Sequence, residues 1–272
     1  MTKKIIASGS FDNLCSKQVR FLHEISKFGQ VHLLLFSDEL LDSIGGTEPK
    51  FPLPERQYYL RSIRYVNQVH TITDLEQLQN IPEIVDQKAD TWFVLPSEEI
   101  PQFKQYAESG GFEYRPVTDE QLAGFPENET SRQPSSKKKV IVTGCFDWFH
   151  SGHIRFFEEA CEYGELFVVV GHDKNIKLLK GPGHPMFSQD ERRYMVGAIR
   201  FVKQALISSG HGWLDAEPEI RRIKPDIYIV NEDGDKEAKR EYCQSCGIEY
   251  VVLKRLPKPG LQRRISTNLR GF

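Results

Sequence analysis

The stretch V-T-G-C-F-D-W-F-H-S-G-H at residues 142–153 decides the fold of this chain. An apolar run breaks at Gly144, a short loop follows, and two histidines, His150 and His153, come at the start of an amphipathic segment. That order predicts a buried strand, a loop and a helix that begins at the histidines. Imidazoles at a helix N-terminus can donate hydrogen bonds to phosphate oxygens, and Gly152 between them would let a phosphate approach the backbone. The stretch therefore predicts phosphate chemistry.

Apolar strands alternate with helices on both sides of this stretch. In the second half, strands are expected at 140–144, 166–171, 205–208, 227–230 and 250–253, and helices at 151–163, 188–201, 215–222 and 235–246. Continuous apolar strands that alternate with helices predict an α/β fold with a doubly wound parallel sheet. Such sheets bind ligands beyond the carboxyl ends of their strands, where residues 146–153 would lie.

The first half of the chain repeats the second at an offset of 135 residues, which becomes 136 after about residue 50. The matched pairs include Gly9 and Gly144, Phe11 and Phe146, Asp12 and Asp147, and Arg56 and Arg192. A constant offset over this length indicates an internal duplication. We expect one domain over 1–125, a polar linker over 126–139 and a second domain over 140–272.

The chain has 272 residues and a net charge of −2, which hides an asymmetry. Residues 1–136 carry 13 Lys and Arg against 20 Asp and Glu, a net charge of −7, whereas 137–272 carry a net +5 and suit an anionic ligand. No apolar run is long enough for a transmembrane helix and no signal peptide is evident, so we expect a cytoplasmic protein. Nucleic acid is not an expected partner. Five cysteines make no disulfide framework, and Cys243 and Cys246 lack a second pair for zinc.

Four motifs in the second half occur in the order typical of one family. They are Gly144–His153, Lys180-Gly181, Glu191-Arg192 and Ile265-Ser266-Thr267. With these motifs the chain resembles the cytidylyltransferase-like nucleotidyltransferases. The stretch 180–192 is especially similar to that of the ethanolamine-phosphate cytidylyltransferases, which are also tandem duplications. The resemblance implies two tandem Rossmann-like nucleotidyltransferase domains.

The family's reaction is attack by a phosphate oxygen of one substrate on the α-phosphorus of CTP or ATP, with release of pyrophosphate. The resemblance implies that His150 and His153 bind the triphosphate and stabilise the transition state, and that Lys180 bridges the two phosphates. It assigns nucleotide binding to Gly144, Cys145, Phe146, Asp147, Gly152, Arg192, Ser266 and Thr267. Candidates for contact with the acceptor are Asp147, Trp148, Arg263 and Arg264. No side chain is assigned to a metal, and Mg²⁺ is expected to arrive with the triphosphate.

Three functions stay open at this point. The first is transfer of CMP from CTP to a small phosphorylated alcohol or sugar, such as phosphoethanolamine or glycerol phosphate. The second is an adenylyltransferase that uses ATP, as in heptose-phosphate or FAD-forming relatives. The third is a catalytically silent nucleotide-binding or regulatory protein. A thermal-shift comparison of nucleotides would separate them.

The first copy has lost the residues that carry the chemistry. Cys15, Lys17 and Gln18 stand where the second copy has its two histidines and the glycine between them, and Gly45 stands in place of Lys180. We expect this copy to be non-catalytic and to form an internal pseudo-dimer with the second, because a duplicated chain contains its own twofold partner. A homodimer of the whole chain stays open.

Overall fold

The chain forms two compact units, Met1–Gly124 and Phe125–Phe272. A computed structural model describes residues 3–12, 14–45, 48–85, 89–127 and 136–269. Much of the predicted linker, at 128–135, lies outside the described residues. The association of the two copies as a pseudo-dimer stays a prediction.

Each unit contains one five-stranded sheet in which every pair of neighbouring strands is parallel. The strands of the first unit are β1 (Lys4–Gly9), β2 (Gln30–Phe36), β3 (Gln68–Ile72), β4 (Thr91–Val94) and β5 (Glu113–Pro116). Those of the second are β6 (Lys139–Gly144), β7 (Glu165–Val170), β8 (Val202–Ile207), β9 (Ile227–Asn231) and β10 (Glu249–Leu253). The orders β3-β2-β1-β4-β5 and β8-β7-β6-β9-β10 are the same, which confirms the doubly wound α/β fold.

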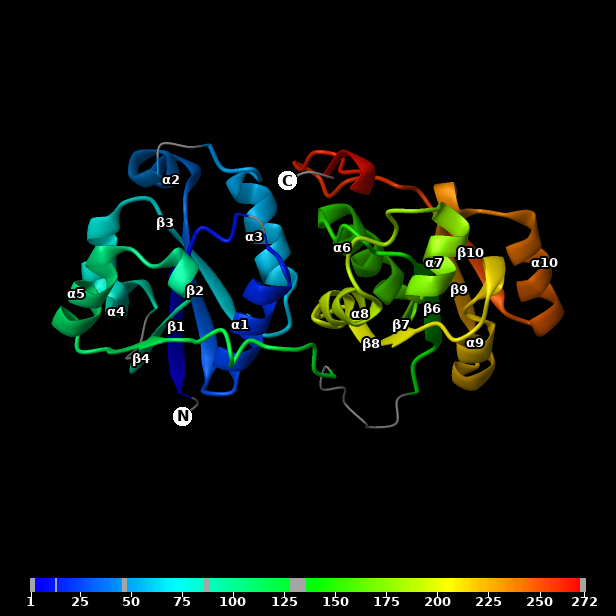
Figure 1. The fold of residues 1–272 in the computed structure, drawn as a ribbon, viewed down its shortest axis with the longest axis horizontal. Coiled ribbons are helices and arrows are strands. Elements are labelled where there is room, and N and C mark those ends of the chain that lie inside the picture. The colour runs from blue at the N-terminus through cyan, green and yellow to red at the C-terminus, as the bar shows by residue number, and fades with distance from the viewer. Residues whose placement is uncertain (1–2, 13, 46–47, 86–88, 128–135, 270–272) are drawn as a thin grey trace. The chain divides into compact units, whose positions relative to one another are not determined.

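Helices cover both faces of each sheet (Figure 1). The first unit has α1 (Ser16–Ser26), α2 (Asp38–Gly45), α3 (Leu53–Ser62), α4 (Ile81–Ile84), α5 (Pro101–Ser109) and the 3₁₀ turns η1 (Leu75–Asn80) and η2 (Pro96–Glu98). The second has α6 (Ser151–Ala160), α7 (Asp173–Lys180), α8 (Gln189–Gly197), α9 (Glu217–Ile223), α10 (Glu237–Cys246) and the turns η3 (Cys161–Tyr163), η4 (Gly212–Leu214), η5 (Glu232–Gly234) and η6 (Ser266–Leu269). In Figure 1, α6 and α8 lie on one side of the second sheet, and α9 and α10 lie on the other. None of the helices within the described ranges is long and apolar enough to cross a bilayer.

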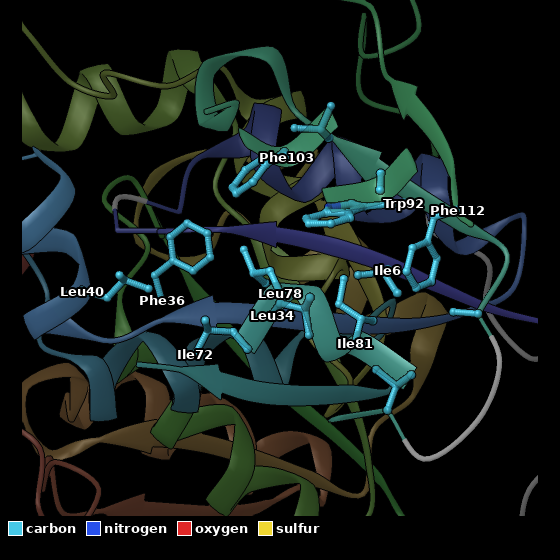
Figure 2. Packing of buried hydrophobic residues seen from close by; sticks show 14 residues of the cluster. Ile6, Leu34, Phe36, Leu40, Ile72, Leu78, Ile81, Trp92, Phe103 and Phe112 are labelled. Carbon is cyan, nitrogen blue, oxygen red and sulfur yellow. The ribbon is translucent and has the colours of Figure 1, made fainter. Parts of the chain in front are cut away.

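The first unit keeps a full hydrophobic core although its motif residues have changed. Figure 2 shows Trp92 of β4 packed with Phe103 of α5 and Phe112, and the Trp92 and Phe103 ring centroids are 5.3 Å apart. Ile6 and Leu34 from neighbouring strands complete the same face of the sheet. Burying one such side chain stabilises a fold by about 1.5–3 kcal/mol. The first copy is therefore a folded domain in its own right, with its core intact.

The duplication extends to individual hydrogen bonds. In the first unit Asp12 accepts from the backbone N–H groups of residues 50 and 51, at 2.8 Å each. In the second unit Asp147 accepts from those of residues 186 and 187, at 2.8 and 3.0 Å. Phe11 and Phe146, directly before these aspartates, both have a left-handed backbone, with φ of 44° and 52°. Both copies thus build the same strained turn after the first strand of the sheet.

Several element boundaries differ from the sequence predictions, and three differences concern helices of the second unit. The helix expected over 188–201 ends at Gly197, because the chain turns there and enters β8 at Val202. The first predicted helix ends at Ala160 and continues as a 3₁₀ turn. The helix α7, which the sequence analysis did not predict, ends at Lys180, and Gly181 with φ of 84° follows it. A glycine with positive φ at this position is a common helix stop.

Candidate active site

A cavity of about 320 Å³ opens at the carboxyl ends of β6 and β9. These strands are neighbours, and the chain leaves them toward opposite sides of the sheet, which is the switch point where doubly wound folds bind ligands. The predicted site residues on its wall are Gly144, Cys145, Phe146, Asp147, Trp148, His150, Gly152, His153, Lys180 and Ser266. The fold thus gathers most of the predicted residues around one space large enough for a small ligand.

The two histidines cap the helix that they begin. His150 is the N-cap of α6, and its Nδ1 accepts a hydrogen bond from the backbone N–H of Gly152 at 3.0 Å. The Nδ1 atom of His153 accepts from the N–H of His150 at 3.3 Å. Because an accepting Nδ1 carries no proton in the neutral ring, the proton of each imidazole lies on Nε2. The caps therefore fix the tautomer that can donate a hydrogen bond through Nε2.

Both rings are neutral; His150 is buried and His153 is half-buried. His150 is 3% exposed, and burial together with Arg255 and Arg264 lowers its pKa to about 3. Burial lowers the pKa of His153 well below its usual value, and His150, Arg255 and Lys180 add to that shift. Burial and nearby positive charge both disfavour the imidazolium form. At neutral pH the pair offers two hydrogen-bond donors and no charge of its own.

Glycine is required at two positions of the motif by the rings beside it. A Cβ at Gly152 would lie 2.9 Å from Cε1 of His150, so a side chain there would displace the capping imidazole. A Cβ at Gly144 would lie 2.8 Å from the ring of Phe146. That ring packs edge-on against His153, with centroids 5.4 Å apart. The glycines therefore let the aromatic and imidazole rings pack closely over the end of β6.

Asp147 ties the motif loop to the segment before α8. Its Oδ1 accepts from the N–H groups of Met186 and Phe187, as described above. Its Oδ2 is buried, has no hydrogen-bond partner among the described residues and lies 3.8 Å from Nδ1 of His184. Trp148 donates to the sulfur of Met186 at 3.1 Å and packs edge-on against Phe187. Asp147 thus has one structural oxygen and one oxygen at the cavity wall.

Besides Lys239 of α10, two cationic side chains from other elements reach the cavity. Lys180, exposed at the end of α7, and Arg255, just beyond β10, both line it. Arg255 is held by an ion pair with Asp233 and by its own N–H, which donates to Glu232 at 3.3 Å. Two positive side chains facing two neutral donors make an environment suited to a polyanion.

Arg192 does not line the cavity. It is 1% exposed, and its guanidinium donates to the carbonyls of Phe187, Cys145 and Gly171 at 2.6–3.0 Å. It also pairs with Asp173 at 2.8 Å. These contacts join three segments at the carboxyl ends of β6 and β7, which gives Arg192 a positioning role, and the nucleotide contact expected from the sequence stays a prediction.

The first copy gives independent support for this positioning role. Arg56 donates to the carbonyls of Phe51, Ser10 and Phe36 at 2.7–2.9 Å and pairs with Asp38. Each of these partners stands at the position that matches a partner of Arg192. A copy without the catalytic residues keeps the whole network, so the network maintains the fold.

The C-terminal segment contributes its predicted residues unevenly. Ser266 begins the 3₁₀ turn η6, and its hydroxyl lies 3.3 Å from both the carbonyl oxygen of Trp148 and Nε2 of His150. Because His150 carries its proton on Nε2, Ser266 accepts from it and donates to Trp148. Arg263 and Arg264 line a smaller space of about 20 Å³ beside the main cavity. The side chain of Thr267 lies outside the described residues.

Sequence reasoning missed several residues on the cavity wall. They are Thr143, Phe156, His184, Val230, Asn231, Asp233, Gly234, Lys239 and Arg255. Most of them follow the carboxyl ends of β9 and β10, and the rule that places ligands at such ends was the signal that could have found them.

The described residues contain no group of three or more His, Cys, Asp or Glu side chains that could hold a metal ion. Cys243 is buried in the core under α10, where burial raises the pKa of its thiol to about 11, and Cys246 is exposed. These two cysteines therefore do not form a metal site with neighbours in the described ranges.

Comparisons with known proteins give one family match and several similar proteins. Residues 141–255 match the family described as cytidylyltransferase-like. A protein named FAD synthase from Ferroglobus placidus is 37% identical over 120 residues, which cover 43% of this chain and 75% of that protein. A bifunctional protein HldE from Campylobacter concisus is 33% identical over 136 residues, which cover 50% of this chain and 27% of that longer protein. A lipopolysaccharide core biosynthesis protein from Thermoplasma volcanium, of known structure, is 26% identical, with a TM-score of 0.37 over 44% of this chain and 98% of that one.

Proposed function

We propose that this chain, which belongs to the cytidylyltransferase-like nucleotidyltransferases, transfers AMP from ATP to a phosphate monoester and releases pyrophosphate. The observation that carries the choice of nucleotide is the 37% identity to a protein named FAD synthase, 75% of which is covered. FAD is FMN joined to AMP through a pyrophosphate bond, so making it from FMN is adenylyl transfer. The relatives' names therefore favour the adenylyl alternative over the cytidylyl function first expected from the sequence.

The reaction needs no nucleophile from the protein. An oxygen of the acceptor phosphate attacks the α-phosphorus, a new P–O–P bond forms, and the bond from that phosphorus to the bridging oxygen breaks as pyrophosphate leaves. A phosphate monoester is already a competent nucleophile, so the site has to align the two substrates and stabilise the charge that develops.

The histidines supply neutral donors for that charge. The Nε2–H groups of His150 and His153 are fixed by the helix caps and stay uncharged at neutral pH. A preorganised donor of this kind contributes about a hundredfold to a thousandfold in rate. Ser266 accepts from His150 in the free protein, and a phosphate oxygen would replace it as the acceptor.

Lys180 and Arg255 supply positive charge. Lys180 lies at the end of a helix followed by Gly181 and Gly183, both with positive φ, so its segment has the backbone freedom to move over a bound polyanion. Arg255 is anchored by Asp233 and is already positioned beside the histidines. We assign Lys180 to the bridge between acceptor and α-phosphate, and Arg255 to the triphosphate.

Mg²⁺ fits this site as a companion of the triphosphate. It prefers phosphate oxygens and water and needs few protein ligands. Asp147, which lines the cavity, is the carboxylate that would contact it or its water. When bound, the ion would neutralise charge on the leaving pyrophosphate.

We assign catalysis to the second copy alone. The first copy has Cys15 and Gln18 in place of the two histidines, and its Lys17 is engaged with Asp119 at 2.8 Å. The domain assignment that follows is a non-catalytic domain over 1–125 and a catalytic one over 140–272. One triphosphate should therefore bind per chain.

A panel of ATP, CTP, GTP and UTP with Mg²⁺, read by thermal unfolding, tests the choice of nucleotide. Ligand at a hundred times its Kd stabilises the folded state by about 2.7 kcal/mol. We expect ATP to give the largest shift, and His153→Ala to reduce it. Pyrophosphate release with FMN and with sugar phosphates then identifies the acceptor. A thermal shift with CTP alone would establish the cytidylyltransferase alternative. Nucleotide binding without release of pyrophosphate in the presence of any acceptor would favour a catalytically silent protein.

A further inference from the structure

The carboxylate of Glu98 lies over the end of β1 in the first copy. Glu98 is the last residue of the 3₁₀ turn η2, which follows β4. Its Oε2 accepts from the N–H and the hydroxyl of Ser10 at 2.9 and 2.8 Å, and its Oε1 accepts from Nε2 of Gln18 at 3.0 Å. A Cβ on Gly9 would lie 3.0 Å from Oε2, so the carboxylate sits directly above this glycine. The first copy thus holds an anionic group at the switch point of its own sheet.

The donors that hold Glu98 have counterparts at the proposed active site. Ser10 matches Cys145, and Gln18 matches His153. The match of Gln18 extends to its hydrogen bonds, because its Oε1 accepts from the N–H of Cys15 at 3.0 Å just as Nδ1 of His153 accepts from that of His150. Its Nε2 then donates to a carboxylate, as Nε2 of His153 is placed to donate to a phosphate. The Glu98 carboxylate therefore occupies the position of a substrate oxyanion in the first copy.

The second copy has Gly234 where the first has Glu98. β4 and β9 carry the same register, because Thr91 pairs with Glu113 and Ile227 with Glu249, each at the offset of 136. Both strands continue into a three-residue 3₁₀ turn that ends at this position. The residue that follows each turn accepts from a tyrosine hydroxyl of the last strand. Tyr114 donates to Glu99 at 2.6 Å, and Tyr250 donates to Asp235 at 3.1 Å.

Gly234 lines the cavity and leaves it open. A Cβ there would meet only the Cβ of Val230, at 3.8 Å, among the described atoms. Its φ is not positive, so an L-residue fits the backbone without strain. The absence of a side chain at Gly234 is therefore required neither by packing nor by conformation, and space for a ligand is the remaining reason for it.

We propose that the residue at this position decides which copy accepts phosphate. Glu98 closes the first copy because its carboxylate takes the place and the donors of a phosphate oxygen. Gly234 keeps the second copy open, and it is a binding determinant that the sequence motifs do not contain. That the bound anion is a nucleotide rests on the proposed function. That Glu98 closes one copy and Gly234 leaves the other open rests on the geometry of the two copies.

Gly234→Glu in the full chain tests the open copy, with Gly234→Ala as the matched control. Titration calorimetry with ATP and Mg²⁺, and separately with inorganic tripolyphosphate, gives the affinities. The introduced carboxylate should take the donors of Cys145 and His153, and a like charge beside phosphate costs several kcal/mol, so we expect at least about a hundredfold loss for both ligands. Gly234→Ala should lose far less affinity than Gly234→Glu, because its methyl group clashes with no protein atom, brings no charge and takes no hydrogen-bond donor.

Glu98→Ala tests the closed copy, with Glu108→Ala, an exposed carboxylate of α5, as its control. Hydrogen exchange by mass spectrometry separates peptides of the two copies. Loss of the carboxylate leaves the Ser10 and Gln18 donors without their partner, so we expect exchange in β1 and α1 to accelerate about tenfold or more. Inorganic phosphate should slow it again several-fold, and sodium chloride at equal ionic strength should not.

The outcomes separate this inference from the proposed function. Wild-type affinity in Gly234→Glu, or a Glu98→Ala protein that exchanges as slowly as the wild type, would overturn the inference. So would acceleration in Glu98→Ala that phosphate does not reverse. A wild-type chain that binds tripolyphosphate and loses it in Gly234→Glu, yet binds no nucleotide, would refute the proposed function and support the inference.

Discussion

Replacing Arg192 by alanine should destabilise the second unit without removing any group from the cavity wall. Its guanidinium makes four hydrogen bonds, three of them to carbonyls of separate segments, and it is 1% exposed. Each carbonyl that loses a buried charged donor costs about 1–1.5 kcal/mol. Asp173, whose side chain is 42% exposed, can regain water and adds little. The expected loss is therefore about 3–5 kcal/mol, the range measured when one partner of a buried ion pair is removed.

Arg56→Ala is the matched control, because Arg56 makes the same contacts in the copy that lacks the histidines. Urea unfolding, followed by hydrogen exchange in peptides of each unit, should show a loss of about the same size in the unit that carries the change. Arg192→Lys should recover little, since one ammonium group cannot span the three carbonyls. The affinity for ATP should fall in Arg192→Ala only to the extent that the second unit loses stability, and it should hardly change in Arg56→Ala.

The opposite pattern would refute this reasoning. If Arg192→Ala unfolds at the wild-type urea concentration and yet binds no ATP, then Arg192 contacts the nucleotide, as the resemblance to the family first implied. A large loss of stability in Arg192→Ala with none in Arg56→Ala would show that the two networks are not equivalent.

Three further results are expected. His153→Ala should lower kcat by about a hundredfold to a thousandfold and should lower the free energy of unfolding by about 1 kcal/mol, because the cap of α6 is lost. In the wild type, ¹⁵N spectra should show that its ring protonates at a pH well below 6.5. The pKa of His150 is about 3 when folded against 6.5 usually, so its contribution to stability is complete above pH 6.5 and is lost as the pH falls toward 3. That loss is about 1.4 kcal/mol per pH unit, and a smaller difference between pH 7 and pH 5 in His150→Asn would confirm it. Cys15→Ala and Lys17→Ala should leave turnover within a few-fold of the wild type, whereas Lys180→Ala should lower it at least tenfold. A large effect of either first-copy change on turnover would mean that this copy takes part in catalysis.

The sequence by itself determined the α/β class, the duplication and the start of α6 at the histidines. Each of these features can be recognised from residues close together in the sequence or from the constant offset between the two copies. The short apolar run that ends at Gly144 favours a buried strand, and the caps of His150 and His153 are contacts within three residues. The loss of the motif in the first copy was equally visible, because matched positions can be compared without coordinates.

Only the tertiary structure decided which distant residues share the site and which predicted ones do not. Arg255 and Gly234 reach the cavity because β9 lies beside β6 and β10 beside β9, and sheet order is not a local property of sequence. The resemblance implied that Arg192 binds the nucleotide, whereas the structure shows that its guanidinium donates hydrogen bonds to three backbone carbonyls. Glu98 had no signal at all in the sequence. Glu98 can be recognised only from its contacts with three donors and a glycine that lie about 80 or more residues away in the sequence. These residues come together only after the chain has folded.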